Sequence, residues 1–227
     1  TRRSSDLRVL YISYDGMCDV LGRSQVIPYL QGLAARGHTI HILSFEKSGV
    51  AQQELEEVSQ ILTESKIEWH PQQFRTKPPM VAKIADLISV LHVSRKLFKR
   101  TKYDIIHCRS YIAAFAGLAL KQRYNAKFVF DIRGFWIDER IEGKIWSLTN
   151  PIFRLFYYYL RKKEKQFFKN ADAVISLTHN GKSIIGERFG ELVLQKTTVI
   201  PCCADINLFS RENVGETSIA QLRNKLG

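Results

Sequence analysis

Charged and polar side chains stand at the ends of two apolar runs of the sequence. Arg109 and Ser110 follow YDIIHC, while Asp131 and Arg133 close KFVFDI and the residues just after it. An arginine offers several oriented donors that suit phosphate oxygens, and a nearby carboxylate can hold it in place. If both runs are parallel strands, their carboxyl ends meet at one edge of a sheet. The sequence therefore predicts an anion-binding crevice at that edge.

Further candidates follow these strand ends. The segment 135–150 lacks periodicity and holds Asp138 and Glu139, which predicts an exposed functional loop or flap. Adjacent residues of a loop need not point the same way, so these two acids do not establish an acid/base pair. Thr178 and His179 come directly after another apolar run, and both are candidates for the same crevice.

Each arginine also has a purely structural interpretation. Arg133 can form a salt bridge to Asp131 or Asp138 that only holds the loop, and Arg109 can be a surface cation at a strand end. We expect His107 to face the core. The sequence leaves the structural and functional interpretations of both arginines open.

The opening stretch 7–45 supplies the element that would position a ligand against these side chains. It reads as strand, helix and strand, with Ser24 as the expected helix cap. The intervening loop contains Gly16 and Gly22 and is longer than the ~2 to 6 residues that a strand-to-helix turn needs. Because the spacing is not G-x-G-x-x-G, it can be a phosphate-binding loop or simply a long turn.

Strand-like and helical segments alternate along the rest of the chain. This alternation predicts an α/β, Rossmann-like fold: a mostly parallel sheet of about six or seven strands with helices on both faces. Further strands are expected at 67–70, 103–108, 127–132, 171–177 and 197–200, and helices at 51–65, 80–100, 111–124, 151–170, 180–189 and 217–226. Residues 71–79 are expected to form a loop.

The domain prediction divides the chain at residue 204. Residues 1–204 form one Rossmann-like domain, and 205–227 form a linker and a helix that we expect to lead to a further domain. Gly227 is the expected residue after that helix.

The amino-acid composition limits the classes of protein to which this sequence can belong. The four cysteines show no ligand spacing with the histidines, so we expect reduced thiols, no metal site and no cofactor. No apolar run approaches the ~18 to 20 residues of a membrane span, and we expect no signal peptide. We expect a cytoplasmic protein that is soluble or peripheral at the inner face of the cell membrane.

The net charge of +12 is concentrated in two segments. Residues 75–102 contain eight basic residues and one acid, and residues 144–169 contain seven and one. The cations near the end of the first predicted helix, including Lys96, Lys99 and Arg100, can complement the helix dipole or lie against an anionic membrane surface.

Taken together, these motifs resemble the N-terminal half of GT-B glycosyltransferases of the retaining family 4 type, which serve cell-wall and polysaccharide synthesis. The resemblance covers nearly the whole chain. It is carried by LGRSQVIPYLQGLAARGH, YDIIHCRS, FDIRGFWIDER, NADAVISLT and VIPCCADINLF, in the order that the family has them.

The resemblance implies an acceptor-binding domain that faces a donor-binding domain across a cleft. It places Gly22, with Gly16, in the loop facing the donor diphosphate, and Arg133 where many relatives carry a histidine that contacts the donor sugar. The resemblance makes Asp131 and Arg133 the catalytic candidates. The candidates for binding the acceptor or lining the cleft are Arg109, Ser110, Asp138, Glu139, Thr178 and His179. The implied substrates are a nucleotide sugar and a glycan or lipid-linked acceptor, and the 227 residues alone should be an inactive half.

Two rival classes fit parts of the sequence. A nucleotide-binding oxidoreductase would share the fold but lacks the glycine fingerprint. A basic nucleic-acid-binding module is suggested by the cationic helix 151–170, although its aromatic residues follow a packing stripe. We expect no nucleic acid partner.

Overall fold

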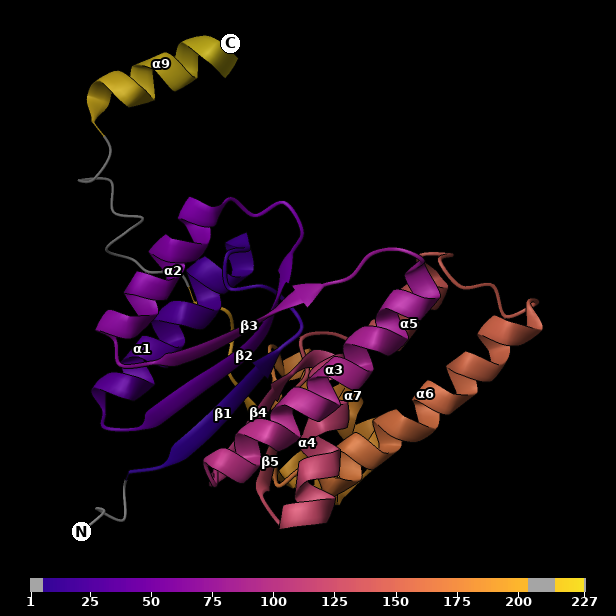
Figure 1. The fold of residues 1–227 in the computed structure, drawn as a ribbon. Helices are drawn as coiled ribbons and strands as arrows, with labels where there is room; N and C mark the ends of the chain where they lie inside the picture. The colour runs from indigo at the N-terminus through magenta and orange to yellow at the C-terminus, as the bar shows by residue number, and fades with distance from the viewer. Residues whose placement is uncertain (1–5, 204–214, 227) are drawn as a thin grey trace.

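The computed structural model describes residues 6–203 and 215–226 and is built on one seven-stranded sheet (Figure 1). The strand order is β3-β2-β1-β4-β5-β6-β7, and every neighbouring pair is parallel. The strands are β1 (Arg8–Ser13), β2 (Thr39–Lys47), β3 (Glu68–Phe74), β4 (Ile105–Arg109), β5 (Lys127–Asp131), β6 (Ala173–Ser176) and β7 (Thr197–Val199). The expected parallel α/β sheet is confirmed.

Helices join the strands and cover both faces of the sheet (Figure 1). They are the π-helical turn η1 (Gly22–Val26), α1 (Ile27–Ala35), α2 (Gln52–Glu64), α3 (Pro79–Arg100), α4 (Ser110–Tyr124), α5 (Trp136–Glu142), α6 (Pro151–Asn170), α7 (His179–Phe189), α8 (Glu191–Gln195) and α9 (Glu216–Leu226). The short helices α5 and α8 are the ones that the sequence analysis missed.

The two faces of the sheet have separate hydrophobic cores. On one face, Leu30 of α1 and Val58 of α2 pack over β1 and β2. On the other, α3, α4 and α6 pack over the sheet, where Phe128 and Phe167 are fully buried. The helices α1 and α2 connect β1, β2 and β3, so they cover only that half of their face of the sheet. On the same face, the strands beyond β1 form the floor of a cavity.

The strand order reverses between β1 and β4, so the loops that follow these two strands diverge. In an open parallel sheet this switch point, at the carboxyl ends of the strands, is where ligands bind. The side chains that the sequence places after β1, β4 and β5 therefore meet at this crevice.

Three local predictions are wrong. Ser24 does not cap α1: its hydroxyl donates to the Val20 carbonyl oxygen at 2.7 Å, and helical structure already begins at Gly22. The wide turn η1 is explained by Pro28, which lacks the N–H that a regular helix needs there. The expected loop 71–79 instead continues β3 through Pro71 to Phe74, as an edge strand permits.

The third correction concerns residues 135–150, which are not a free flap. Residues 136–142 form α5, whose Ile137 is fully buried. The Trp136 ring lies 5.9 Å from that of Tyr111 and 5.4 Å from that of Trp146. The contact with Tyr111 anchors the segment to α4, and the Trp146 ring, 5.4 Å from that of Phe156, anchors it to α6.

The predicted linker at 205–215 lies almost wholly outside the described residues, as does Gly227. The division at residue 204 therefore stays a prediction, although the helix expected at 217–226 is present as α9. Among the described residues, no helix has the length and apolar character required to cross a bilayer.

Candidate functional site

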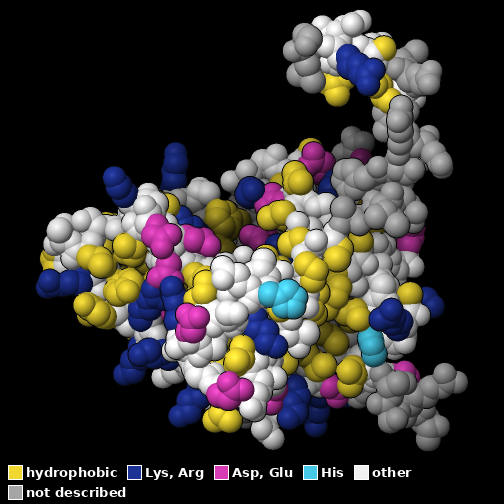
Figure 2. Space-filling model, turned by 180° about the vertical axis from the view of Figure 1, so that it is seen from behind, with side chains coloured by type: hydrophobic (Ala, Val, Ile, Leu, Met, Phe, Trp, Pro, Cys, Tyr) yellow, Lys and Arg dark blue, Asp and Glu magenta, His cyan; other side chains and the backbone are white. Residues whose placement is uncertain are grey.

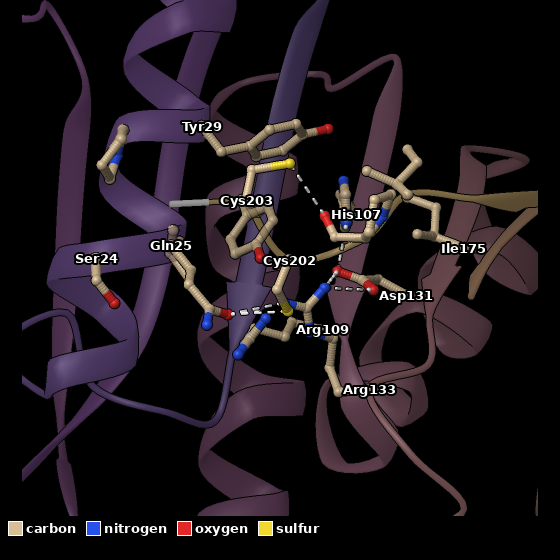
Figure 3. A pocket seen from close by; sticks show the side chains of 15 residues that line it. Ser24, Gln25, Tyr29, His107, Arg109, Asp131, Arg133, Ile175, Cys202 and Cys203 are labelled. Carbon is tan, nitrogen blue, oxygen red and sulfur yellow. Dashed lines mark hydrogen bonds and ion pairs between the residues drawn. The ribbon is translucent and has the colours of Figure 1, made fainter. Parts of the chain in front are cut away.

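A cavity of about 360 Å³ opens at the carboxyl edge, on the same side of the sheet as α1 (Figure 3). We call it cavity 1. The pairing register explains its floor, because Arg109, Asp131 and Ile175 are aligned on neighbouring strands and paired residues share a face. Its other walls come from η1, from Tyr29 of α1 and from residues 200–203 after β7.

Asp131 is the centre of the charges in cavity 1 and is 4% exposed. Its carboxylate lies 3.4 Å from Nε2 of His107 and accepts from Nη1 of Arg133 at 3.3 and 3.4 Å. Burial alone would raise the pKa of Asp131. The hydrogen bond with His107 and the charges of Arg133 and Arg109 outweigh it and lower that pKa, so the carboxylate stays ionised.

Arg133 faces the cavity with the other edge of its guanidinium group. Its Nη2 donates to Oε1 of Gln25 at 3.2 Å and lies 3.6 Å from Sγ of Cys202. The side chain remains 20% exposed. The salt bridge to Asp131 is therefore present, and Nη2 is turned toward Gln25 and Cys202, which line cavity 1 (Figure 3).

Arg109 is not the surface cation that one interpretation expected, because it is only 3% exposed. Its Nε donates to Oδ2 of Asp15 at 3.1 Å. Burial works to lower the pKa of Arg109, but Tyr11 and the Asp15 carboxylate raise it overall. A buried, permanently charged guanidinium thus lies beside Asp131 in the wall of cavity 1.

His107 is the site residue that the sequence analysis misplaced. It is buried, as expected, but it lines cavity 1, where its ring lies 4.6 Å from that of Tyr11. The signal was available in the alternation of the strand, since His107 and Arg109 are two residues apart and must share a face.

A second cavity, of about 330 Å³, lies between the loop after β1 and the helices α3, α4 and α5. Ser110 lines this cavity 2, with a left-handed backbone φ of 68°. Nζ of Lys83 lies 4.6 Å from the centre of the Tyr14 ring and 4.9 Å from that of Phe74. Trp136 adds another aromatic surface.

A third cavity, of about 270 Å³, shares Arg133 with cavity 1 and contains Thr178. Oγ1 of Thr178 accepts from the N–H of Gly181 at 2.9 Å, which caps α7. His179 is exposed at the start of that helix and lines none of these three cavities. The single crevice expected from the sequence is therefore divided into three adjoining spaces.

Asp138 and Glu139 do not join the crevice. Asp138 forms ion pairs with Arg161 of α6 and Arg188 of α7, so it ties three helices together. Glu139 is exposed on α5. Neither residue lines these three cavities, and the adjacent acids point to different neighbours, as helical spacing requires.

The two loop glycines are buried and pack against protein. A Cβ on Gly22 would lie 2.2 Å from the carbonyl oxygen of Gly16, so only glycine permits the loop to lie on η1. A Cβ on Gly16 would lie 2.6 Å from Oε2 of Glu46. The carboxylate of Glu46 accepts from the backbone N–H groups of Met17 and Cys18 at 2.8 and 3.1 Å. These two donors are thus held by the protein itself.

The cations proposed for a membrane surface lie in the last turns of α3. Lys96 and Lys99 are exposed, whereas Arg100 lies 3.5 Å from Oε1 of Glu68. Exposed apolar side chains lie instead in the first halves of α3 and α6: Val81, Ile84, Ile88, Ile152, Leu155 and Tyr158. From behind, hydrophobic side chains flanked by Lys and Arg gather at the end of the molecule where α6 begins (Figure 2).

Comparison with solved structures shows which known proteins share this fold. HepE of Anabaena, solved in complex with UDP and glucose, is 16% identical with a TM-score of 0.57, over 97% of this chain and 50% of that one. A glycosyltransferase of Rickettsia africae is 18% identical with a TM-score of 0.59, over 97% and 49%. Sucrose-phosphate synthase of Thermosynechococcus elongatus is 16% identical with a TM-score of 0.62, over 96% and 52%. This chain spans about half the length of each.

These likenesses confirm the expected Rossmann-like half of a GT-B fold. A search of curated proteins gives no match. The family model described as Glycosyltransferase Family 4 matches residues 26–208, which is well over half of the sequence. The chain therefore belongs to glycosyltransferase family 4.

Proposed function

We propose that this chain is the acceptor-binding half of a retaining glycosyltransferase, and that cavity 1 faces the donor diphosphate. The enzyme would transfer a sugar from a nucleotide sugar to a glycan or lipid-linked acceptor in cell-wall or polysaccharide synthesis. One observation carries the proposal: Arg133 is fixed by the buried Asp131 at 3.3 Å while its Nη2 faces cavity 1. Because HepE was solved with UDP-glucose, a UDP-sugar is the first donor to test.

In the proposed reaction, the bond between the anomeric carbon and the leaving diphosphate oxygen breaks. The acceptor oxygen bonds to the anomeric carbon on the same face, and its proton passes to the departing diphosphate. No nucleophile of the protein is needed. The proposed role of Arg133 is to stabilise the negative charge that develops on the diphosphate. Asp131 keeps the guanidinium group oriented before that charge appears.

The buried charges suit this role for a physical reason. A guanidinium group that is already held in place needs no reorganisation when the bond breaks, and it acts in a partly dehydrated cavity. Arg109, held by Asp15, adds a second positive charge to the same wall. Removal of one such donor typically lowers turnover by about 100- to 1,000-fold.

Cavity 2 is the proposed acceptor subsite. Tyr14, Phe74 and Trp136 offer aromatic faces, and Lys83 and Arg140 offer cations to a charged acceptor. Asp15 belongs to cavity 2, and its ion pair with Arg109 joins this space to cavity 1.

A lipid-linked acceptor would bring the protein to the inner face of the cell membrane. The exposed apolar side chains on the first halves of α3 and α6, with the basic residues around them, support a peripheral attachment. They extend the proposed surface beyond Lys96, Lys99 and Arg100.

Titration of the chain with UDP-sugars, NAD and an oligonucleotide tests the proposal. Binding of a UDP-sugar, reduced in Arg133→Ala and unchanged in Arg36→Ala at the end of α1, is the expected result. Preferential binding of NAD or of the oligonucleotide would contradict it. The 227 residues alone should transfer no sugar, because the donor-binding domain is proposed to lie in the rest of the enzyme. Measurable turnover by this chain would refute that part.

A further inference from the structure

Two histidines and a glutamate converge at the amino edge of the sheet, the edge opposite cavity 1. His41 of β2 is the register partner of Glu68 of β3, and His70 lies two residues further along β3 on the same face. Nδ1 of His41 lies 3.4 Å from Oε2 of Glu68, and Nε2 of His70 lies 3.2 Å from its Oε1. One ligand atom from each residue lies within 4.8 Å of the other two.

These separations match a metal site. Ligand atoms at 2.0 to 2.2 Å from a tetrahedral zinc ion lie roughly 3.3 Å from one another. Two imidazoles and one carboxylate are also a donor set that zinc accepts when three protein ligands leave the fourth position to water. Small side-chain rotations would bring both nitrogens to one ion.

One imidazole nitrogen of the group is available as a ligand without displacement of a hydrogen-bond partner. Nε2 of His70 is buried and, apart from its 3.2 Å ion-pair contact with Glu68, forms no hydrogen bond within the described part of the chain. Glu68 is 39% exposed, so an ion can reach the group from solvent.

Two neighbours compete with a cation. The Tyr103 hydroxyl lies 2.9 Å from Nδ1 of His41, and Nη2 of Arg100 lies 3.5 Å from Oε1 of Glu68. An incoming ion would displace the tyrosine from that nitrogen and the arginine from that carboxylate. These two contacts therefore engage Nδ1 of His41 and Oε1 of Glu68.

We infer that His41, Glu68 and His70 form a divalent-cation site for zinc, distinct from the glycosyltransferase cavity. An ion there would join β2 to the edge strand β3 and release the Arg100 side chain from Glu68. Because the group lies at the amino edge, the ion would stabilise the fold and take no part in sugar transfer. This site departs from the expectation of no metal that the cysteine spacing gave.

The test uses zinc sulfate and the 227-residue chain carrying Cys202→Ser and Cys203→Ser, since exposed thiols also bind zinc. Calorimetric titration should show one equivalent bound, and zinc should raise the melting temperature by several degrees. His70→Gln and Glu68→Gln should each weaken binding by at least about 10-fold. His92→Gln, an exposed residue of α3, is the matched control and should bind as the parent does.

Two variants distinguish a zinc site from a cluster that only stabilises the fold. Tyr103→Phe and Arg100→Gln each remove a competitor and should tighten zinc binding several-fold. With Co²⁺ in place of zinc, the parent should show tetrahedral visible absorbance that His70→Gln lacks. Failure of the parent to bind zinc, or equal binding by His70→Gln and the parent, would overturn the inference.

Discussion

Replacement of Asp131 by asparagine removes the charge that holds cavity 1 together and keeps the side-chain volume. At 3.3 Å and an effective dielectric constant of 20, the attraction between Asp131 and Arg133 is about 5 kcal/mol before desolvation is subtracted. Breaking a buried pair typically costs ~3 to 5 kcal/mol, and the 20% exposure of Arg133 lets water recover part of it. We therefore expect Asp131→Asn to lower the free energy of unfolding by about 2 to 3 kcal/mol.

Urea unfolding at pH 7, followed by tryptophan fluorescence, measures this difference. A double-mutant cycle with Arg133→Gln should give a coupling of roughly 1 to 2 kcal/mol. Asp19→Asn breaks a comparable but exposed pair with Lys47 and should cost less than about 1 kcal/mol. If Asp131→Asn cost no more than this control, the carboxylate would not be organising the cavity.

The same variant tests the lowered pKa of Asp131. A carboxyl whose pKa is lower in the folded state stabilises the fold above its unfolded pKa of ~3.9, and this contribution is lost as pH falls through the folded value. The deficit of Asp131→Asn should therefore be complete at pH 7 and shrink below about pH 4. A deficit that stayed constant with pH would contradict the assignment.

The remaining predictions concern the core, the thiols and the surface. Gly117→Ala should lower the free energy of unfolding by about 1 to 3 kcal/mol in urea melts, since its Cβ would lie 2.4 Å from a buried phenylalanine ring; an unchanged midpoint would refute this packing. Burial and Glu46 raise the pKa of Cys18 to about 12, so mass spectrometry should find it alkylated more slowly than the exposed Cys202; equal rates would argue against it. Glutamate at Lys96 and Lys99 should weaken sedimentation with anionic vesicles at low salt, and binding that ignores both salt and these changes would exclude an electrostatic surface.

The alternation of apolar runs was sufficient to predict the parallel sheet and nearly all long helices. Helix boundaries depended on contacts that no local pattern reveals. Pro28 widens the first turn into η1, and Trp136 packs α5 against α4 where the sequence suggested a flap. Both outcomes are decided by tertiary neighbours.

The sequence predicted which side chains converge at the site only where the register of the strands determines their positions. Arg109 and Asp131 are aligned on β4 and β5, so their convergence follows from the parallel sheet. Asp138 follows no such rule, because its partners Arg161 and Arg188 come from helices whose rotation the sequence does not specify. Glu46 was likewise missed, since its role depends on the path of the β1 loop.

Turnover of a nucleotide sugar by the complete enzyme, compared between the parent and Arg133→Ala, is the most direct test of the proposed role of Arg133. Arg36→Ala serves as the control at the opposite edge of the sheet. We predict that Arg133→Ala lowers kcat by about 100-fold or more, with unfolding transitions that remain cooperative, while Arg36→Ala transfers sugar at the parental rate. A correctly folded Arg133→Ala enzyme with unaltered kcat would contradict this role and leave Arg133 a purely structural partner of Asp131.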